Sequence, residues 1–433
     1  MIKKLVLVFI AVIAMRCYGQ EGTTSPYSFY GIGSLKFKGT VENRSMGGLS
    51  IYSDSIHVNL RNPASYAGDN LKVWGNESRP IKFAVGGGYT STNFKSNSGS
   101  DEAASSTFDY LVLSIPVGKF GFGFGLLPYT SVGYKLESLN DDGLLENRFN
   151  GEGGLNKAFL GFGYQITKGL TVGIDFQYNF GNIQNSAVEF QYDNGVPIQL
   201  QSRENNRSDL SGLNINLGLT YKRMLNKKLE LTSSVTFTPQ SNLTSKNERS
   251  FSAIRTSVSG QEVVFNTIEA DLDALGLLES DLTLPSRLAF GAGVGKPLKW
   301  FVGAETTFLK TSKFSNALYS SPNTIYEDAY SFSVGGFYIP DYRAFNGYWK
   351  RIVYRAGIRN EETGLNLNNE SIKEFGISFG VGLPVGSYFS NANLGFEVGK
   401  RGTTNSNLIQ ENFVNFQLSL SLNDRWFTKR KYD

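Results

Sequence analysis

Residues 119–127 read KFGFGFGLL, with phenylalanine and glycine strictly alternating at its centre. Successive side chains of a β-strand point to opposite faces of the sheet, so this stretch predicts one fatty face and one nearly bare face. Its Gly-x-Gly-x-Gly lacks the strand-to-helix setting of a dinucleotide-binding motif. We therefore expect the glycines to line a barrel interior or to permit curvature.

The same two-residue period recurs along the chain. Apolar residues alternate with polar or small ones at 170–179, 375–383 and 413–422. About 14 to 16 such runs lie between Ile81 and Leu422, and about 9 to 11 residues are enough for a strand to span a membrane. The pattern predicts an all-β, transmembrane antiparallel β-barrel of about 14 strands over residues 81–433. A periplasmic β-sandwich is the alternative, although sandwich strands are usually shorter.

The composition agrees with a sheet protein. The 433 residues include 48 Gly, 32 Phe and 22 Tyr but only 4 Met, and 18% are charged, below the roughly 25% of ordinary soluble domains. Aromatic residues pack well on pleated surfaces, whereas unbranched residues suit helices. An all-helical fold and an ordinary cytosolic enzyme are therefore disfavoured.

The N-terminus predicts export. Residues 1–19 carry two lysines, an uncharged run and small residues before a plausible cut, which is typical of a cleaved signal peptide. Its loss would remove Cys17, the one cysteine, and a lipoprotein role for this residue is disfavoured by Arg16 before it. No later stretch reaches 18 consecutive apolar residues, so an exported chain of this kind is periplasmic or a barrel.

The charge gives no sign of a nucleic-acid partner. The formal charge of +4 includes Lys3, Lys4 and Arg16 of the predicted signal peptide; without them 42 − 3 = 39 basic residues face 38 acidic ones, a net charge of +1. No basic stripe interleaved with aromatic residues is present.

Two stretches interrupt the barrel pattern. Residues 20–80 are mixed and precede the first convincing strand, so we expect a separate N-terminal hatch segment. Residues 240–286 predict a long loop with an amphipathic helix, because apolar residues are spaced by four, three, three and four. This helix would either pack on the barrel rim or offer an apolar docking face, formed by Ile268, Leu272, Leu275, Leu278 and Leu282.

The search for catalytic chemistry is negative. His57 is the only histidine, so histidine metal clusters and Ser-His-Asp arrangements cannot be assembled. Acid pairs such as Asp141 with Asp142 and Glu361 with Glu362 lie in apparent loops and indicate solvated turns. We expect no catalytic residues, no metal and no cofactor; a two-carboxylate hydrolase has no positive support.

The N-terminal section resembles a known family. NRSMGGLSIYSDSIHVNLRNPASYA, residues 43–67, resembles the hatch of FadL-like outer-membrane proteins, which carry hydrophobic molecules across that membrane. LPSRLAFGAGV at 284–294 and YRAGI at 354–358 are further similarities. The resemblance implies a 14-stranded barrel plugged from the N-terminus, with hatch or lumen residues at Gly47, Gly48, Asn62, Pro63 and Ala64. Asn62-Pro63 also suits a plain rigid turn without a ligand role.

A narrower resemblance rests on SPYSFYGIG at 25–33, GKRGT at 399–403 and the tail LNDRWFTKRKYD at 422–433. Together with NPASY they are similar to a branch of large Bacteroidota-type barrels, one member of which occludes the pore of the type 9 secretion translocon. The chain also departs from many outer-membrane barrels, because it continues past its last strand to a basic tail.

Two functions follow as hypotheses for a non-enzymatic protein of a Gram-negative outer membrane. The first is a hatch-plugged channel for uptake of hydrophobic small molecules, with membrane lipid and such a molecule as partners. The second is an interaction protein that docks on and occludes a large outer-membrane protein translocon. The presence of a continuous apolar tunnel would favour transport, and a filled lumen with a flat apolar outer patch would favour plugging.

Overall fold

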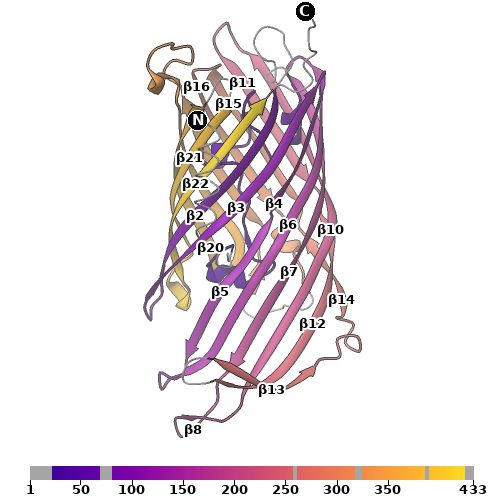
Figure 1. Cartoon of the computed structure of the whole chain (residues 1–433), viewed down its shortest axis with the longest axis vertical. Coiled ribbons are helices and arrows are strands. Elements are labelled where there is room, and N and C mark those ends of the chain that lie inside the picture. The colour runs from indigo at the N-terminus through magenta and orange to yellow at the C-terminus, as the bar shows by residue number, and fades with distance from the viewer. Residues whose placement is uncertain (1–21, 69–79, 257–260, 317–323, 386–389, 425–433) are drawn as a thin grey trace, which may run out of the picture.

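The computed structural model describes residues 22–68, 80–256, 261–316, 324–385 and 390–424 (Figure 1). The predicted signal peptide at residues 1–19 and the end of the basic tail lie outside these ranges. Of the predicted hatch segment, residues 22–68 and residue 80 are described. We call residues 22–68 the N-terminal segment.

Strands dominate the described chain, and only short helical turns accompany them. The elements of the N-terminal segment are η1 Pro26–Phe29, β1 Ser34–Leu35, α2 Val41–Arg44 and η2 Pro63–Tyr66. The strands that follow are β2 Ile81–Lys95, β3 Ser100–Val117, β4 Phe120–Pro128, β5 Thr130–Leu139, β6 Leu145–Thr167, β7 Leu170–Glu189, β8 Tyr192–Asp193, β9 Val196–Pro197, β10 Gln201–Met224, β11 Glu230–Thr238, β12 Ser241–Thr256, β13 Glu262–Glu269, β14 Glu279–Leu284, β15 Arg287–Lys296, β16 Trp300–Leu309, β17 Thr324–Tyr326, β18 Ala329–Tyr338, β19 Val353–Leu367, β20 Glu370–Val385, β21 Ser390–Arg401 and β22 Gln410–Asp424. The remaining helical turns are η4 Thr311–Lys313, η5 Tyr348–Arg351 and η6 Asn405–Asn407.

The strands form a closed antiparallel barrel of 14 strands, which confirms the predicted fold class. Neighbouring wall strands pair in sequence order except between β3 and β5, and β2 closes the ring on β22 from Ile81↔Asp424 to Lys95↔Gln410. Several wall strands consist of two pieces in line. β11 and β12 are separated at Pro239, and β14 and β15 at Pro285. Proline removes a ladder donor, which explains breaks at these positions.

The alternation predicted from KFGFGFGLL is present in β4. Phe120 and Phe124 are 52% and 44% exposed on the outer wall, whereas Gly121 and Gly123 are buried on the inner one. In β7, Phe176 and Tyr178 are likewise exposed between buried polar neighbours. The outer wall is therefore apolar and the inner wall small or polar.

The predicted amphipathic helix at 268–282 is wrong. The region forms a hairpin of β12 with β13, then a turn, then β14 paired with β12. Leu282 is buried inside the barrel and Leu272 is buried in the turn, while Ile268, Leu275 and Leu278 are at least half exposed, so they share no apolar face. Backbone pairing with β12 and the left-handed turn at Gly276 (φ 65°) exclude a helix here.

The two ends of the barrel differ. At one end most connections are short, such as the two-residue turns after β3 and β6, although residues 339–352 between β18 and β19 also lie there, and β22 ends there beside the start of β2. At the other end most connections are longer, and they include β8, β9 and β13 (lower part of Figure 1). In outer-membrane barrels short turns face the periplasm, so we call these the periplasmic and extracellular ends. No helix in the described part of the chain is long and apolar enough to cross a membrane.

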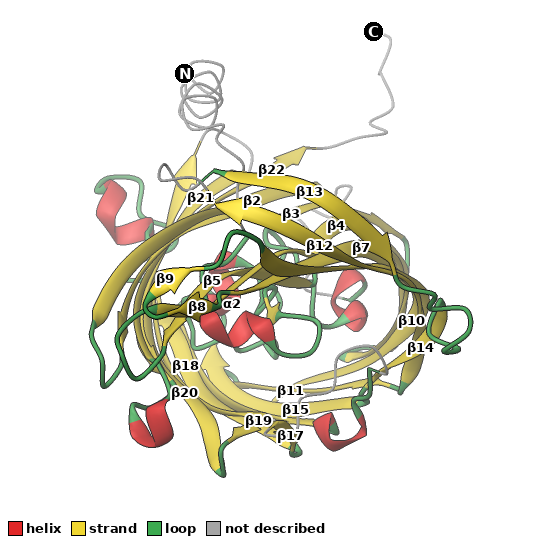
Figure 2. Ribbon diagram, turned by 90° about the horizontal axis from the view of Figure 1, so that it is seen from below, coloured by secondary structure: helices red, strands yellow, loops and turns green. Residues whose placement is uncertain are grey.

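The N-terminal segment lies inside the ring of strands. Viewed along the barrel axis, α2 is surrounded by the wall (Figure 2). α2 contacts β20, β21 and β22 on one side of the lumen, and η2 contacts β4, β6, β7 and β10 on the other. The segment therefore spans the lumen from wall to wall.

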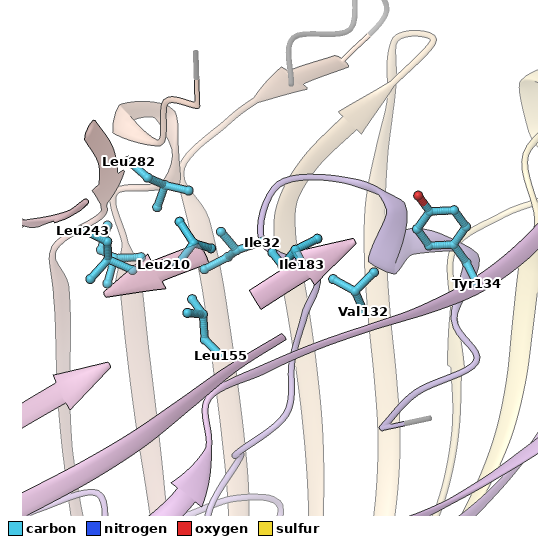
Figure 3. Packing of buried hydrophobic residues seen from close by; sticks show 9 residues of the cluster. Ile32, Val132, Tyr134, Leu155, Ile183, Leu210, Leu243 and Leu282 are labelled. Carbon is cyan, nitrogen blue, oxygen red and sulfur yellow. The ribbon is translucent and has the colours of Figure 1, made fainter. Parts of the chain in front are cut away.

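An apolar cluster fills one side of the extracellular half of the lumen (Figure 3). Ile32 of the N-terminal segment packs there against inward-facing residues of β5, β6, β7, β10, β12 and β14, namely Val132, Tyr134, Leu155, Ile183, Leu210, Leu243, Leu282 and Leu284. The lumen thus has an apolar side although most of its wall is polar.

A charge placed on the outer wall tests whether this surface meets lipid. Phe176→Lys, in the apolar run of β7, is expected to destabilise the barrel in phospholipid vesicles by about 2–4 kcal/mol, the cost of a lysine near the bilayer centre. Denaturant unfolding in vesicles measures it. Phe265→Lys is the control, because Phe265 is 59% exposed on the extracellular hairpin strand β13. Equal costs for both variants would contradict a lipid-facing β7.

Candidate functional site

Asn62, Pro63 and Ala64 lie inside the barrel at the start of η2. The Asn62 side chain accepts a hydrogen bond from the Ala64 N–H at 3.0 Å, and its amide donates to Thr220 Oγ1 on β10 at 3.0 Å. Asn62 and Pro63 are almost fully buried, and Ala64 has no exposed surface. Asn62 therefore both caps its own turn and fixes the turn to the barrel wall.

Wall glycines make room for this turn. A side chain at Gly121 or Gly123 of β4 would collide with Tyr66, one at Gly173 of β7 with Pro63, and one at Gly218 of β10 with Asn62. The bare face of KFGFGFGLL thus receives the backbone and the ring of Tyr66 in η2.

Gly47 and Gly48 follow α2 on the opposite side of the lumen. Both have left-handed backbone conformations, with φ of 71° and 86°. The Gly47 N–H donates to Ser378 Oγ on β20 at 2.9 Å, and the Gly48 carbonyl accepts from Arg61. These glycines shape a tight turn against the wall, and a role in a hatch stays a prediction for them and for Asn62, Pro63 and Ala64.

A buried carboxylate holds the middle of the N-terminal segment. Glu305 of β16 accepts hydrogen bonds from the Ser50 N–H at 2.7 Å and from Ser50 Oγ at 2.8 Å. Arg61 Nη2 lies 2.9 Å from the other oxygen of Glu305. Two distant parts of the segment are therefore bound to one wall residue.

A second charged cluster lies on β19, β20 and β21. Arg359 contacts Glu361 at 2.6 Å, Glu374 at 2.6 Å and Glu397 at 2.7 Å. Lys38 of the N-terminal segment approaches Glu374 at 2.6 Å. Removing one partner from such a buried group costs several kcal/mol, so these contacts resist displacement of the segment.

Arg44 links the same cluster to β3, on the other side of the β2–β22 pairing that closes the barrel. Its guanidinium lies 3.3 Å from Glu397 on β21 and 3.7 Å from Asp109 on β3. Asp109 sits at a bulge where the register of β2 with β3 shifts between Gly86 and Gly87. Bulges of this kind re-aim a side chain, here toward the lumen.

At the periplasmic end of the segment, His57 contacts Asp54 and Lys82. Its Nδ1 lies 2.7 Å from Asp54 Oδ2, and Lys82 Nζ donates to the His57 carbonyl at 2.8 Å. Burial opposes ionisation of Asp54, but its charge and hydrogen-bond interactions with His57 outweigh burial and hold the pKa of this carboxyl well below its ordinary value. The arrangement fixes a loop, and no group of three His, Cys, Asp or Glu residues in the described ranges could hold a metal.

The wall is interrupted beside β1. β4 pairs with β3, but the strand breaks after Pro128 and its continuation, β5, pairs with β6 and not with β3, although both strands are fully described. The free edge of β5 is instead met by β1, with Ser34↔Ser131 and Leu35↔Thr130, and the Lys36 N–H donates to the Tyr129 carbonyl at 3.0 Å. The N-terminal segment thus supplies a short strand where the wall lacks one.

A cavity of about 130 Å³ lies next to this interruption. Aromatic rings from the N-terminal segment and the wall line it together with Leu35 at the interruption, and the charged residues Lys38, Glu361, Glu374 and Arg401 form another part of its lining. The rings belong to Tyr27, Tyr30, Tyr129, Phe314 and Tyr326. A second cavity of about 900 Å³ lies at the periplasmic end and shares no described lining residue with the first.

Several of these residues were not expected from the sequence. Glu361 and Glu362 were predicted to lie in a solvated turn, but both lie in β19, where Glu361 pairs with Arg359 and Glu362 with Lys373 at 2.8 Å. Glu305 and Arg359 were missed. The available signal was a charge at an inward position of an otherwise apolar, alternating strand.

One family model matches the chain over its full length. Residues 1–433 match the family described as BamG. The chain belongs to the BamG family. No curated protein sequence matches it.

Solved structures share the fold of this BamG-family chain at low identity. The Ralstonia pickettii toluene transporter TbuX has a TM-score of 0.56 and 15% identity over 88% of this chain and 97% of that one. The P. putida toluene transporter TodX has a TM-score of 0.56 and 17% identity over 90% and 99%. A Pseudomonas aeruginosa FadL homologue has a TM-score of 0.55 and 11% identity over 90% and 99%. The expected resemblance is thus correct for the fold, while the family is BamG.

The packing of η2 against the wall glycines can be tested by adding a side chain at one of them. Gly173→Val places a branched side chain where the Pro63 backbone lies, and overpacking of this kind costs about 1–3 kcal/mol. We expect a lower unfolding temperature in a heat-modifiability gel. Gly99→Val, at a loop glycine with open space around it, is the control. An unchanged unfolding temperature for Gly173→Val would show that η2 does not pack on β7.

The Glu305 anchor can be tested by neutralising it. Glu305→Gln leaves Arg61 without its buried carboxylate and weakens two hydrogen bonds to Ser50, so we expect the segment to loosen and ions to leak. Planar-bilayer conductance should rise above that of the unchanged chain. Glu327→Gln, at an exposed carboxylate that bonds Ser371, should leave conductance unaltered. Unchanged conductance of the Glu305→Gln variant would show that Glu305 does not hold the N-terminal segment in place.

Proposed function

We propose that this protein is a non-enzymatic outer-membrane channel that takes up small hydrophobic molecules and releases them sideways through the wall between β3 and β5. The observation that carries the proposal is the break after Pro128, because the aromatic cavity is lined at that point by Leu35 and Tyr129. A hydrophobic molecule would leave the lumen there without displacing the ion pair between Arg61 and Glu305.

The lumen supports this route by its division into two environments. The extracellular half offers the apolar cluster around Ile32 and the aromatic cavity beside it. Deeper in the lumen, Glu305 ties the N-terminal segment to the wall through its buried ion pair with Arg61, while the Lys38–Glu374 pair lies at the charged side of the aromatic cavity. Burying an apolar solute against the first surface is favourable, whereas displacing the ion pairs is costly. Sideways exit is therefore the easier path.

The solved structures of similar fold agree with a transport role. TbuX and TodX are described as toluene transporters, and neither is described as an enzyme. Their identities of 15% and 17% support the shape of the barrel, so the substrate class is our inference from the cavity. The placement in a Gram-negative outer membrane belongs to the same proposal.

A disulfide across β1 and β5 tests the exit. Ser34→Cys with Ser131→Cys joins two register partners in a chain whose own cysteine lies in the predicted signal peptide. Oxidation should hold β1 on the free edge of β5 and reduce liposome uptake of toluene at least tenfold, and a reductant should restore it. Thr90→Cys with Asn415→Cys joins β2 to β22 and serves as the control, with uptake unchanged after oxidation. No toluene uptake by the unchanged chain, or full uptake by the oxidised variant, would overturn the proposal.

The second candidate is an interaction protein that occludes a large outer-membrane translocon. Its support is that the lumen is filled from wall to wall by the N-terminal segment. Affinity purification from native membranes tests it: a large barrel partner should be recovered in amounts comparable to the chain. Recovery of this barrel alone would reject the candidate.

A further inference from the structure

The outer wall carries an apolar groove close to the periplasmic end. It has a volume of about 860 Å³ and runs across β16, β18, β19, β20 and β21. Its floor is the register pair Gly336 and Ala356, which lies between Val302 on β16 and Phe379 on β20. Because Gly336 has no side chain and Ala356 only a methyl, the wall is hollow between the longer side chains, and Val302 and Phe379 are 52% and 54% exposed.

Aromatic residues mark the periplasmic end of this groove. Tyr338 and Tyr354 line it, and the Tyr354 hydroxyl donates to the Trp349 carbonyl at 3.3 Å. Trp349 belongs to η5 in the connection from β18 to β19, and it is 72% exposed. Exposed Trp and Tyr at the end of an apolar wall are typical of the membrane–water interface. The groove therefore lies within the leaflet nearest the periplasm.

Three cations stand at the same end. Lys299 Nζ lies 5.5 Å from the ring centroid of Tyr338, and Lys350 and Arg351 follow Trp349 directly. Within the described ranges none of the three forms an ion pair with a carboxylate, and the buried Nε of Arg351 has no hydrogen-bond partner. This end of the groove thus offers positive charge that the protein itself does not neutralise.

We propose that this surface binds one anionic phospholipid, with an acyl chain in the groove and its phosphate at Lys350 and Arg351. An acyl chain gains by filling a hollow in an apolar wall, and basic residues at a leaflet surface attract anionic headgroups. Arginine suits a phosphate because it donates several hydrogen bonds in a fixed planar arrangement. The combination selects phosphatidylglycerol over zwitterionic phosphatidylethanolamine.

Native mass spectrometry of the full chain tests the headgroup contact. After delipidation and exposure to equal amounts of phosphatidylglycerol and phosphatidylethanolamine, we expect one retained phosphatidylglycerol per chain. Lys350→Gln with Arg351→Gln should lower its retention at least tenfold. Lys227→Gln with Lys228→Gln removes two exposed lysines from the β10–β11 connection at the same end of the barrel and should leave retention unchanged.

Tryptophan quenching tests the groove independently of the charges. Brominated phosphatidylglycerol should quench the fluorescence that Trp349→Phe removes, and Ala356→Leu should abolish that quenching by filling the hollow. Ala292→Leu, at a small exposed position of β15, is the matched control. Equal retention of both lipids, indifference to the Lys350/Arg351 variant and to Ala356→Leu, or a co-purified protein that these variants release in place of lipid would each overturn the proposal.

Discussion

The constraint on which the rest of this structure depends is the direct contact between the backbone of the N-terminal segment and the inner wall. A barrel of this size encloses more space than its own side chains fill, and a leak follows unless something occupies it. Here the occupant is chain backbone, which approaches the wall only where the wall has no side chain. Gly173 receives Pro63 on one side, and Gly357 receives Met46 and Gly47 on the other. The barrel wall therefore needs glycine wherever the backbone of the N-terminal segment contacts it.

Backbone contact alone would leave buried polar groups without partners, and the wall supplies those partners as charges. Glu305 satisfies Ser50 and Arg61, which are distant from it in sequence, and Arg359 gathers carboxylates that also hold Lys38. Such pairs add little net stability compared with apolar packing, but breaking one partner is expensive. They therefore act mainly to specify where the segment lies. The apolar side of the lumen around Ile32 is held by side-chain packing, and none of the described residues of that cluster carries a charge.

The wall was predictable from sequence, because a strand with lipid on one side and a filled lumen on the other must alternate with period two, and residues 120–126 of KFGFGFGLL show this without interruption. The contents of the lumen were less predictable. Glu305 binds a residue 255 positions away, a contact that no local pattern encodes. The helix predicted at 268–282 failed for the converse reason: leucine spacing is a local signal, and pairing with β12 overrode it. Glu361 was assigned to a turn because charge alone does not separate a lumen from solvent.

Within the described ranges, the break after Pro128 is the place where the pairing between wall strands is shortest. Elsewhere neighbouring wall strands share long ladders, such as the fifteen pairs between β2 and β22 from Ile81 to Lys95. At the break only the two residues of β1 pair with β5. A net gain of about 0.5–1.5 kcal/mol per hydrogen bond makes a two-residue pairing far easier to open than a full ladder. The edge it covers is also the one beside the aromatic cavity. The short pairing of β1 with β5 and the aromatic cavity therefore lie side by side, and we expect any opening of the wall to begin there.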